Sequence, residues 1–382
     1  YMEDIKNIMI IKTTKFKEIC STILGATDSA EISTLTETLE LKAENKVLYL
    51  NVTNGEYYAS VKFDLDSDET FNAAVNASLF LKLIAAVTSE NIELEVKDTY
   101  VLVKANGTYK IPLIMDGDKL LSLPVIKIEN PTVNMKISGN ILESILNYNS
   151  KELLRGTISR PVQKMFYVDE TGCITFTTGA CVNNFSLEKP IKVLFNSRLV
   201  KLFKLFKNDM VDFTLGYDSI SDEIVQTKVS FTTDKITLTA ITGCNDELLN
   251  SVPVTAIRGR ANNTYDNNVV LNKNELLDTV NRLLLFSAGY GTSKNLKPYS
   301  TFVCKDDEMT IYSTDKENKE IIKFKNDTKV TDEYTMILDL NDLKLILDTI
   351  TEEYITLSFG NHQAVVVKRT NISNVVPEVR AN

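Results

Sequence analysis

Apolar residues recur along this chain at two spacings. Three segments have an apolar residue at every third or fourth position and one apolar face, which predicts amphipathic helices: residues 13–24, 138–148 and 272–286. Elsewhere apolar and polar residues alternate, as in residues 47–52 and 92–96, which is typical of strands. Turn signals such as Asn54-Gly55 separate the alternating segments. The pattern predicts an α+β fold with antiparallel strands.

The order of these elements recurs three times. Each copy has an amphipathic helix, alternating strands, a second helix opened by Asn or Asp, and another hairpin. The second helices are predicted to begin at Asn76, Asn196 and Asp339, whose short side chains can accept hydrogen bonds from first-turn N–H groups. Turn-rich breaks lie near Asn130-Pro131 and in residues 259–268. We therefore predict three α+β domains, at residues 1–130, 131–260 and 261–382.

Composition favours a cytoplasmic protein. A chain of 382 residues with 43% hydrophobic content can bury substantial cores. A membrane-spanning helix needs about 20 consecutive apolar residues, and neither such a run nor a signal-peptide pattern is found in the sequence. The cysteines are scattered without a C-x-x-C pair and are predicted to be reduced, mostly buried thiols: Cys20, Cys173, Cys181, Cys244 and Cys304.

Candidate catalytic features are weak. The single histidine, His362, excludes His-cluster zinc sites and is expected to face solvent in a hairpin. The sequence has no G-x-x-x-x-G-K-[ST] phosphate loop, and residues 289–294 read as a flexible loop. Asp66 and Asp68 lack the calcium-loop spacing and read as part of a solvated loop. We therefore expect no enzyme activity, no metal and no cofactor.

Several local motifs occur in a distinctive order: Ser159-Arg160-Pro161-Val162, Phe176-Thr177-Thr178-Gly179, Val280-Asn281-Arg282 and Val375-Val376-Pro377-Glu378-Val379-Arg380. With the three like domains, they resemble the bacterial sliding clamp, the beta subunit of DNA polymerase III, over essentially the whole chain. The resemblance implies domains with two helices packed on antiparallel sheets. It also implies a homodimeric ring around double-stranded DNA, a processivity factor in DNA replication that tethers a polymerase and binds DNA without sequence preference.

The chain departs from the clamp pattern in places. Ala180, Cys181 and Val182 stand where the family has His, Arg and Leu, and Glu378 replaces an apolar residue. Gln163 and Lys164 also differ from the typical residues. With a composition rich in Asn, Lys and Ile, these departures suit a phage-encoded clamp.

A net charge of -9 means that most of the surface would repel nucleic acid. One inner face of the protein can still be basic and bind DNA. Residues 196–207 form the best candidate because they hold four cations and no acid, opposite an apolar arc: Arg198, Lys201, Lys204 and Lys207. Taken alone, this helix could be an ordinary solvated face. The companion helices add Lys12, Lys15, Lys82, Lys151, Arg155, Arg282 and Lys344 as candidate DNA contacts. A structural ion pair is the alternative for Arg282.

The resemblance also implies two protein interfaces. A groove for a short apolar peptide motif of the polymerase or clamp loader is expected to be lined by Thr177, Gly179, Val182, Pro253, Val375, Val376 and Pro377. The dimer interface is expected to contain Leu79, Leu83, Ile111 and Leu113 at one end of the chain and Leu285 and Phe286 at the other. The alternative for each apolar residue is a place in the core.

Two other classes of protein remain open. An oligomeric assembly protein, such as a phage virion component, would share the acidic surface, but it has no reason to keep an acid-free basic helix. A metal-dependent nuclease that uses carboxylates alone would need a convergent Asp/Glu cluster, and none stands out in the sequence.

Overall fold

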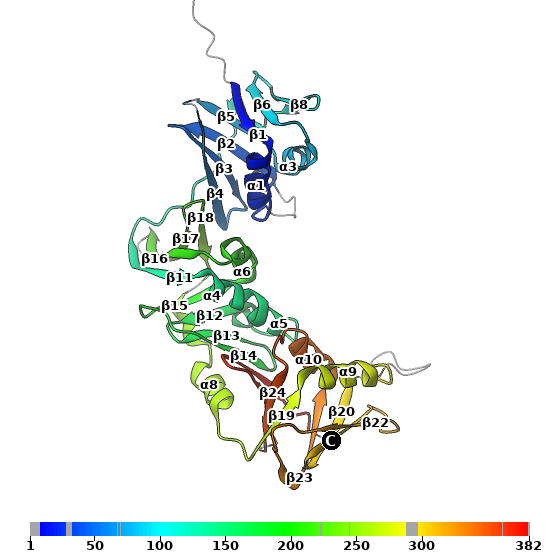
Figure 1. The fold of residues 1–382 in the computed structure, drawn as a ribbon. Coiled ribbons are helices and arrows are strands. Elements are labelled where there is room, and N and C mark those ends of the chain that lie inside the picture. The colour runs from blue at the N-terminus through cyan, green and yellow to red at the C-terminus, as the bar shows by residue number, and fades with distance from the viewer. Residues whose placement is uncertain are drawn as a thin grey trace, which may run out of the picture. The chain divides into compact units, whose positions relative to one another are not determined.

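The computed structural model describes residues 8–27, 33–66, 68, 70–221, 224–243, 245–287, 297–360 and 362–380. Contacts divide the chain into two compact units. Figure 1 labels the helices and strands along the chain. The first unit consists of Tyr1–Leu142 and Lys201–Asn245, and the second of Glu143–Val200 and Asp246–Asn382.

The first unit contains two antiparallel sheets and a small hairpin. The larger sheet has the order β11 (Pro131–Ser138), β16 (Met210–Ser221), β17 (Ile224–Thr232), β18 (Ile236–Thr242), β4 (Tyr57–Asp64), β3 (Val47–Thr53), β2 (Thr38–Glu44) and β5 (Phe71–Asn76). The smaller has the order β1 (Ile8–Lys12), β6 (Asn91–Val96), β7 (Tyr100–Lys104) and β8 (Thr108–Pro112). The hairpin pairs β9 (Met115–Asp116) with β10 (Lys119–Leu120).

The second unit repeats this plan. Its larger sheet has the order β15 (Lys192–Asn196), β12 (Met165–Asp169), β13 (Gly172–Phe176), β14 (Ala180–Asn184), β26 (Ile372–Pro377), β25 (Ala364–Lys368), β24 (Tyr354–Phe359) and β19 (Asn267–Asn272). The smaller has the order β22 (Lys319–Lys323), β21 (Glu308–Tyr312), β20 (Tyr299–Asp306) and β23 (Val330–Asp339). The α+β class with antiparallel sheets is therefore confirmed.

The helices fall where the repeat predicts them. First helices of the three copies are α1 (Thr13–Leu24), the continuous run α4 (Gly139–Ser144), η1 (Ile145–Asn149) and α5 (Ser150–Glu152), and α9 (Lys273–Leu284). Second helices are α3 (Ala77–Ala86), α6 (Ser197–Lys201) continued by η3 (Leu202–Phe206), and α10 (Leu340–Leu347). Shorter helical segments are α2 (Thr34–Glu37), η2 (Pro161–Lys164), α7 (Asp246–Asn250) and α8 (Val254–Asn262).

The predicted helix caps are present. The side-chain oxygen of Asn76 accepts a hydrogen bond from the Leu79 amide at 2.9 Å. Asn196 does the same for the Leu199 amide at 2.8 Å, and Asp339 for the Asn341 amide at 2.9 Å. Each cap satisfies a first-turn N–H that has no partner within its helix, which fixes where the helix begins.

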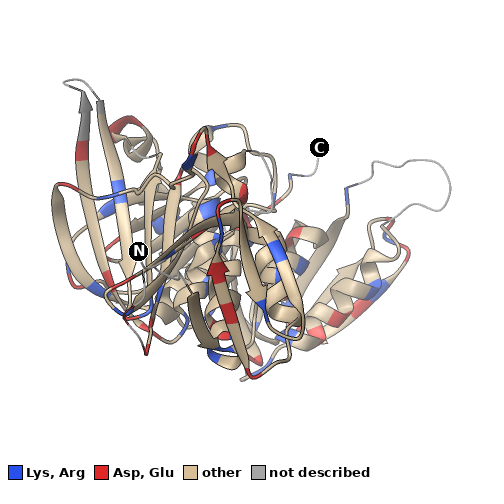
Figure 2. Cartoon of the chain, turned by 90° about the horizontal axis from the view of Figure 1, so that it is seen from above, with Lys and Arg blue, Asp and Glu red and all other residues tan. Residues whose placement is uncertain are grey.

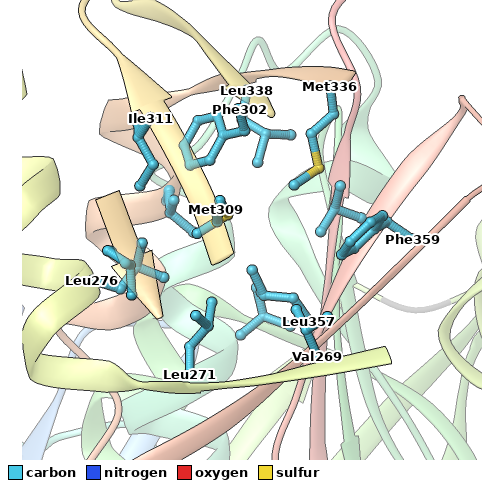
Figure 3. Close-up of a cluster of buried hydrophobic side chains, with 14 of the residues drawn as sticks. Val269, Leu271, Leu276, Phe302, Met309, Ile311, Met336, Leu338, Leu357 and Phe359 are labelled. Atoms are coloured by element: carbon cyan, nitrogen blue, oxygen red, sulfur yellow. The ribbon is translucent and has the colours of Figure 1, made fainter. Parts of the chain in front are cut away.

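Apolar helix faces and sheet faces form the cores. In the first unit, Phe16 of α1 packs edge-on against Phe80 of α3, with ring centroids 6.1 Å apart. Figure 3 shows the corresponding core of the second unit, where Leu276 of α9 lies among strand residues such as Phe302 and Leu357. Full burial of a side chain of this size contributes about 1.5–3 kcal/mol, so these faces are the main stabilising feature of each unit.

Strand pairing crosses both predicted domain boundaries. β4 pairs with β18 in the first unit, for example Val61 with Ile236, and β14 pairs with β26 in the second, for example Ala180 with Val375. The predicted domains are thus joined by continuous sheets, which explains why contacts group the chain into two units. The three boundaries themselves stay a prediction.

Two smaller expectations concern cysteines and membranes. Cys20, Cys173, Cys181 and Cys304 are buried free thiols, as predicted, whereas Cys244 lies outside the described residues. Within the part of the chain that the structure describes, no helix has the length and apolar character needed to span a membrane.

Candidate functional site

The most basic helix of the sequence folds with its cations exposed. Leu199, Leu202, Phe203 and Phe206 of α6 and η3 are buried, while the four cations are exposed: Arg198, Lys201, Lys204 and Lys207. The helix tightens from α to 3-10 geometry at Leu202. Side chains three residues apart eclipse one another in a 3-10 helix, so Lys204, within this segment, is brought into line with Lys201, which directly precedes it. The sequence pattern alone predicts an α-helix throughout residues 196–207.

The buried side of this helix is anchored by aromatic packing in the first unit. Phe203 and Phe213 each lie 5.2 Å from Phe231, measured between ring centroids. A Cβ atom on Gly139, the first residue of α4, would lie 1.7 Å from the Phe206 carbonyl oxygen. Only glycine therefore allows α4 to approach the end of the basic helix this closely.

Most of the companion cations are also accessible. Lys12, Lys15, Lys82 and Lys151 are exposed, and Lys344 of α10 is half-buried. Figure 2 shows that acidic residues are interspersed with basic ones on the helices and strands of the chain. The segment of α6 and η3 carries basic residues and no acidic one, as the sequence predicts.

Arg155 contradicts its predicted role. Its side chain is 1% exposed, and its guanidinium is paired with the carboxylate of Glu152, one helical turn earlier. A buried, paired arginine cannot reach a phosphate outside the protein. Lys151 of α5 is exposed, whereas Glu152 and Arg155 are buried, and the local sequence does not distinguish these positions.

Arg282 forms the structural ion pair that was the alternative to DNA contact. Its guanidinium makes two hydrogen bonds to Glu320 of β22, Nε to Oε1 at 2.8 Å and Nη2 to Oε2 at 2.6 Å. The hydrogen bonds from Arg282 hold the pKa of the Glu320 carboxyl below its ordinary value. Arg282 is half-exposed but engaged, so it is a weaker candidate for phosphate contact than the lysines.

A cavity of about 230 Å³ lies at the predicted partner groove in the second unit. The turn between β13 and β14, the helix α8 and the strand β26 line it. Its wall consists of Phe176, Thr177, Thr178, Gly179, Ala180, Pro253, Ala256, Ile257, Arg260, Gln363, Ala364, Val375 and Pro377. Thr177, Gly179, Pro253, Val375 and Pro377 were predicted from the sequence.

Val182 and Val376 were predicted for the same wall but lie in the core, each 1% exposed. Val376 follows Val375 on β26, and successive side chains of a strand point to opposite faces of the sheet. Val182 is two residues further along β14 than Ala180 and is covered by the packing of the second unit. Sequence reasoning missed Ala256, Ile257 and Arg260 of α8, because no local pattern indicates which helix covers a groove.

Gln163, a departure from the clamp pattern, supports the turn that lines the cavity. Its side-chain oxygen accepts hydrogen bonds from the amides of Ser159 and Arg160, both at 2.9 Å. Its side-chain nitrogen donates to the Thr177 carbonyl at 3.1 Å. The buried glutamine therefore ties the Ser159-Arg160 segment to the cavity wall.

An ionic cluster lies behind the same wall. Besides Glu152, the Arg155 guanidinium approaches the carboxylate of Asp342 on α10 at 3.6 Å and the Val375 carbonyl at 3.5 Å. The Thr177 hydroxyl donates to Glu152 Oε1 at 2.8 Å. Burial raises the pKa of the Glu152 carboxyl to about 7 despite the neighbouring guanidinium, and burial also raises the pKa of Asp342.

Glu378 and Val379, which follow β26, are held beside the cavity. The Glu378 amide donates to the Gln363 carbonyl at 3.1 Å, and the Val379 amide to the Ile337 carbonyl at 2.8 Å. His362 lies in the β24–β25 hairpin with its side chain largely exposed, as predicted, and its ring stacks on Tyr334 at 4.6 Å. This stacking was not foreseen from the sequence.

The predicted interface residues divide into two groups. Leu79, Leu285 and Phe286 are 51%, 69% and 44% exposed, and Leu83 and Leu113 are half-buried. Ile111 is 2% exposed and belongs to the core of the first unit, so its predicted place at an interface is wrong. It is the buried residue of β8, whose other four residues are exposed.

Other candidate chemistry finds little support. Across residues 8–380, leaving aside the segments that are not described, no group of His, Cys, Asp and Glu side chains could hold a metal ion. The loop at residues 289–294 lies outside the described residues. Asp66 and Asp68 are exposed, and the residues beside them, Ser67 and Glu69, are not described.

Comparison with known proteins identifies the fold. The chain is similar to the sliding clamp of Bacillus subtilis, with a TM-score of 0.78 and 15% identity, over 98% of this chain and 99% of that one. It is also similar to the DNA polymerase III beta subunit of Pseudomonas aeruginosa bound to griselimycin, with a TM-score of 0.79 and 14% identity, over 98% and 99% of the two chains. The chain therefore has the sliding-clamp fold.

Sequence similarity is weaker. The beta sliding clamp of Helicobacter pylori strain 26695 is 24% identical over 194 residues, which are 47% of this chain and 51% of that protein. The chain thus spans about half the length of the curated relatives it matches. No protein-family model matches the sequence.

Proposed function

We propose that this chain, which has the fold of the bacterial sliding clamps, is a processivity factor that encircles duplex DNA and tethers a replicative DNA polymerase to it. The observation that carries the proposal is the basic helix of α6 and η3, which exposes Arg198, Lys201 and Lys204 over a wholly apolar buried side. An assembly protein with an acidic surface has no use for such a helix.

The proposed contact with DNA is weak and unspecific. Long cationic side chains that reach phosphates release counterions and carry no base information. A few interchangeable contacts hold the protein near the duplex without fixing a register, so the protein can slide. Lys12, Lys15, Lys82, Lys151 and Lys344 would add to the same lining, and Arg282 only in part because Glu320 engages it.

The proposed ring forms from two chains in head-to-tail contact. β8 and β22 are end strands of their sheets, and an end strand has unpaired backbone groups that can pair with a second chain. Tyr109 of β8 and Ile321 of β22 are exposed apolar side chains, as are Leu79, Leu285 and Phe286. A heterologous contact that closes generates a ring.

The proposed partner site is the cavity lined by Thr177, Gly179, Pro253, Val375 and Pro377. Most of its lining residues are apolar, and Thr177, Thr178, Arg260 and Gln363 add polar groups, which suits a short apolar peptide motif from a polymerase or a clamp loader. The function itself breaks no bond, and ATP-driven loading would come from the loader. A cytoplasmic, phage-encoded origin is part of the same proposal.

Topology tests the proposal. Dissociated protomers are mixed with nicked circular plasmid, allowed to reassociate, and passed through a sizing column at high salt. We expect a dimer by light scattering, retained on the circle and released when a restriction enzyme makes the plasmid linear. A protein that leaves the circle as readily as the linear form is not a clamp.

A further inference from the structure

The cavity has a charged backing that does not face its interior. Glu152, Arg155 and Asp342 are absent from the cavity wall, yet they contact three residues that line it. The Thr177 hydroxyl donates to Glu152, and the Val375 carbonyl accepts from Arg155. A Cβ atom on Gly179 would lie 2.7 Å from Arg155 Nη2 and 2.4 Å from the Val375 carbonyl oxygen, so the guanidinium fills the space directly behind the glycine.

Stability alone does not explain this cluster. Removing a guanidinium and its two carboxyl partners from water has a large desolvation cost, and apolar side chains of similar volume commonly give an equally stable core. The Arg155 Nε atom is buried without a hydrogen-bond partner, which adds to that cost. Because the cluster costs desolvation free energy and lies against a binding cavity, we infer that it shapes that cavity.

We propose that Arg155 is the positioning residue of the partner groove: held by Glu152 and Asp342, its guanidinium fixes the Thr177–Gly179 turn and the Val375 backbone in the conformation that receives a peptide. The inference rests on the proposed function of the groove. The planar guanidinium suits this role because its donors diverge, so that Nη1 binds Glu152 while Nη2 reaches Asp342 and Val375. A lysine would supply one charge but not this fork.

The cluster also joins separate parts of the second unit. Glu152 belongs to α5, Asp342 to α10 and Val375 to β26. A peptide that pressed on the turn or on β26 would therefore work against an arginine anchored on two helices. A groove that is already formed before binding saves the entropy of ordering it, which strengthens binding without any new contact.

Hydrogen exchange of two variants tests the inference. Arg155→Lys keeps the charge, and Asp342→Asn removes one anchor but leaves Arg155 paired with Glu152. We expect amides of residues 176–182 and 372–377 to exchange about tenfold faster in both variants, while α9 exchanges as in the wild type. The control is Asp218→Asn in the first unit, which loses the 2.9 Å ion pair with Lys228 and should leave those two segments unchanged.

Griselimycin provides the binding readout, because it is bound in the Pseudomonas clamp structure. We expect its affinity to fall at least about fivefold in Arg155→Lys and Asp342→Asn, and to be unchanged in Asp218→Asn. Wild-type exchange rates in both segments of the two variants would overturn the inference. If Arg155→Lys does not fold, Asp342→Asn decides by the same criterion. If the wild type does not bind griselimycin, that result counts against the proposed groove, and the exchange rates still decide this inference.

Discussion

The Tyr334 hydroxyl donates a hydrogen bond to the carboxylate of Glu378, with 2.8 Å between Oη and Oε1. The Glu378 side chain is almost fully buried, and burial raises the pKa of its carboxyl. His362 Nδ1 lies 3.6 Å from Oε2 of the same carboxylate. Because Glu378 directly follows Pro377 of the cavity wall, this hydrogen bond helps to hold residues 378–379 beside the groove.

Tyr334→Phe is expected to increase the local opening of residues 378–379. The change leaves a buried carboxylate without its hydroxyl donor, which typically costs about 1–3 kcal/mol. The amides of Glu378 and Val379, which bond to Gln363 and Ile337, should exchange faster by mass spectrometry. The matched control is Tyr354→Phe, since Tyr354 is exposed on β24. Equal exchange at Glu378 and Val379 in the two variants would contradict this role of Tyr334.

Glu152 predicts a pH dependence of stability. In the folded chain this carboxyl keeps its proton up to about pH 7, whereas its ordinary pKa is 4.5. Folding therefore takes up a proton between these values, so the free energy of unfolding falls as the pH rises through this window. Glu152 alone contributes on the order of 3 kcal/mol to that fall.

The measurement is urea unfolding between pH 4.5 and 7.5 for the wild type and Glu152→Gln. Glutamine cannot take up the proton, so the variant should lose less stability as the pH rises. Burial also raises the pKa of Asp342, so any slope that Asp342 adds has the same sign in both proteins. Parallel stability curves for the two proteins would mean that Glu152 does not titrate in this range.

Local signals in the sequence predicted much of this fold. The start of α3, α6 and α10 could be read from Asn76, Asn196 and Asp339, because a cap acts within three residues of its own position. The alternation along β3 and β6 likewise identified strands, since one face of each must be buried. The class of fold follows from the order of such elements.

The features that could not be predicted from the sequence depend on residues that are distant along the chain. Arg155 and Lys201 are both cations in or close after a helix, but Arg155 is buried and Lys201 is exposed. The burial of Arg155 depends on Asp342 and Val375, which lie far along the chain. The bond between Tyr334 and Glu378 joins residues 44 positions apart. The local pattern of apolar and polar residues predicts neither contact.

Leu285 and Phe286 offer a clean test of the proposed ring. Both are exposed beyond the end of α9, so Leu285→Asp with Phe286→Asp should change the stability of the fold by only about 0.5 kcal/mol. An aspartate pair in an apolar interface should convert the dimer into a monomer, as measured by light scattering. Ile111→Asp is unsuitable because that residue is buried and the change would unfold the first unit.

The control for the ring is Leu154→Asp, which changes an equally exposed leucine outside the proposed interface. Its solution mass should equal that of the wild type. A dimer that persists in the Leu285→Asp, Phe286→Asp variant with unchanged thermal unfolding would place the subunit contact elsewhere.

Lys201 and Lys204 allow the DNA contact to be tested apart from the ring. We expect the wild type to bind short linear duplex weakly, with no sequence preference and with a steep loss of affinity as salt is added. Lys201→Glu with Lys204→Glu should lower that affinity further and reduce the slope of log K against log salt by about 2, because each phosphate contact contributes about 0.9. Fluorescence anisotropy on labelled duplexes measures both quantities.

The matched control for the basic helix is Lys62→Glu with Lys192→Glu, two exposed strand lysines whose replacement changes the net charge equally. Because Lys201 and Lys204 lie opposite the buried Leu199 and Phe203, both double variants should unfold at the wild-type temperature. If the control weakens binding as much as Lys201→Glu with Lys204→Glu, overall charge and not this helix governs the interaction.

A wild type that binds short linear duplex tightly and prefers one sequence would recognise bases in a DNA groove. Such base-edge contacts fix a register and are incompatible with sliding.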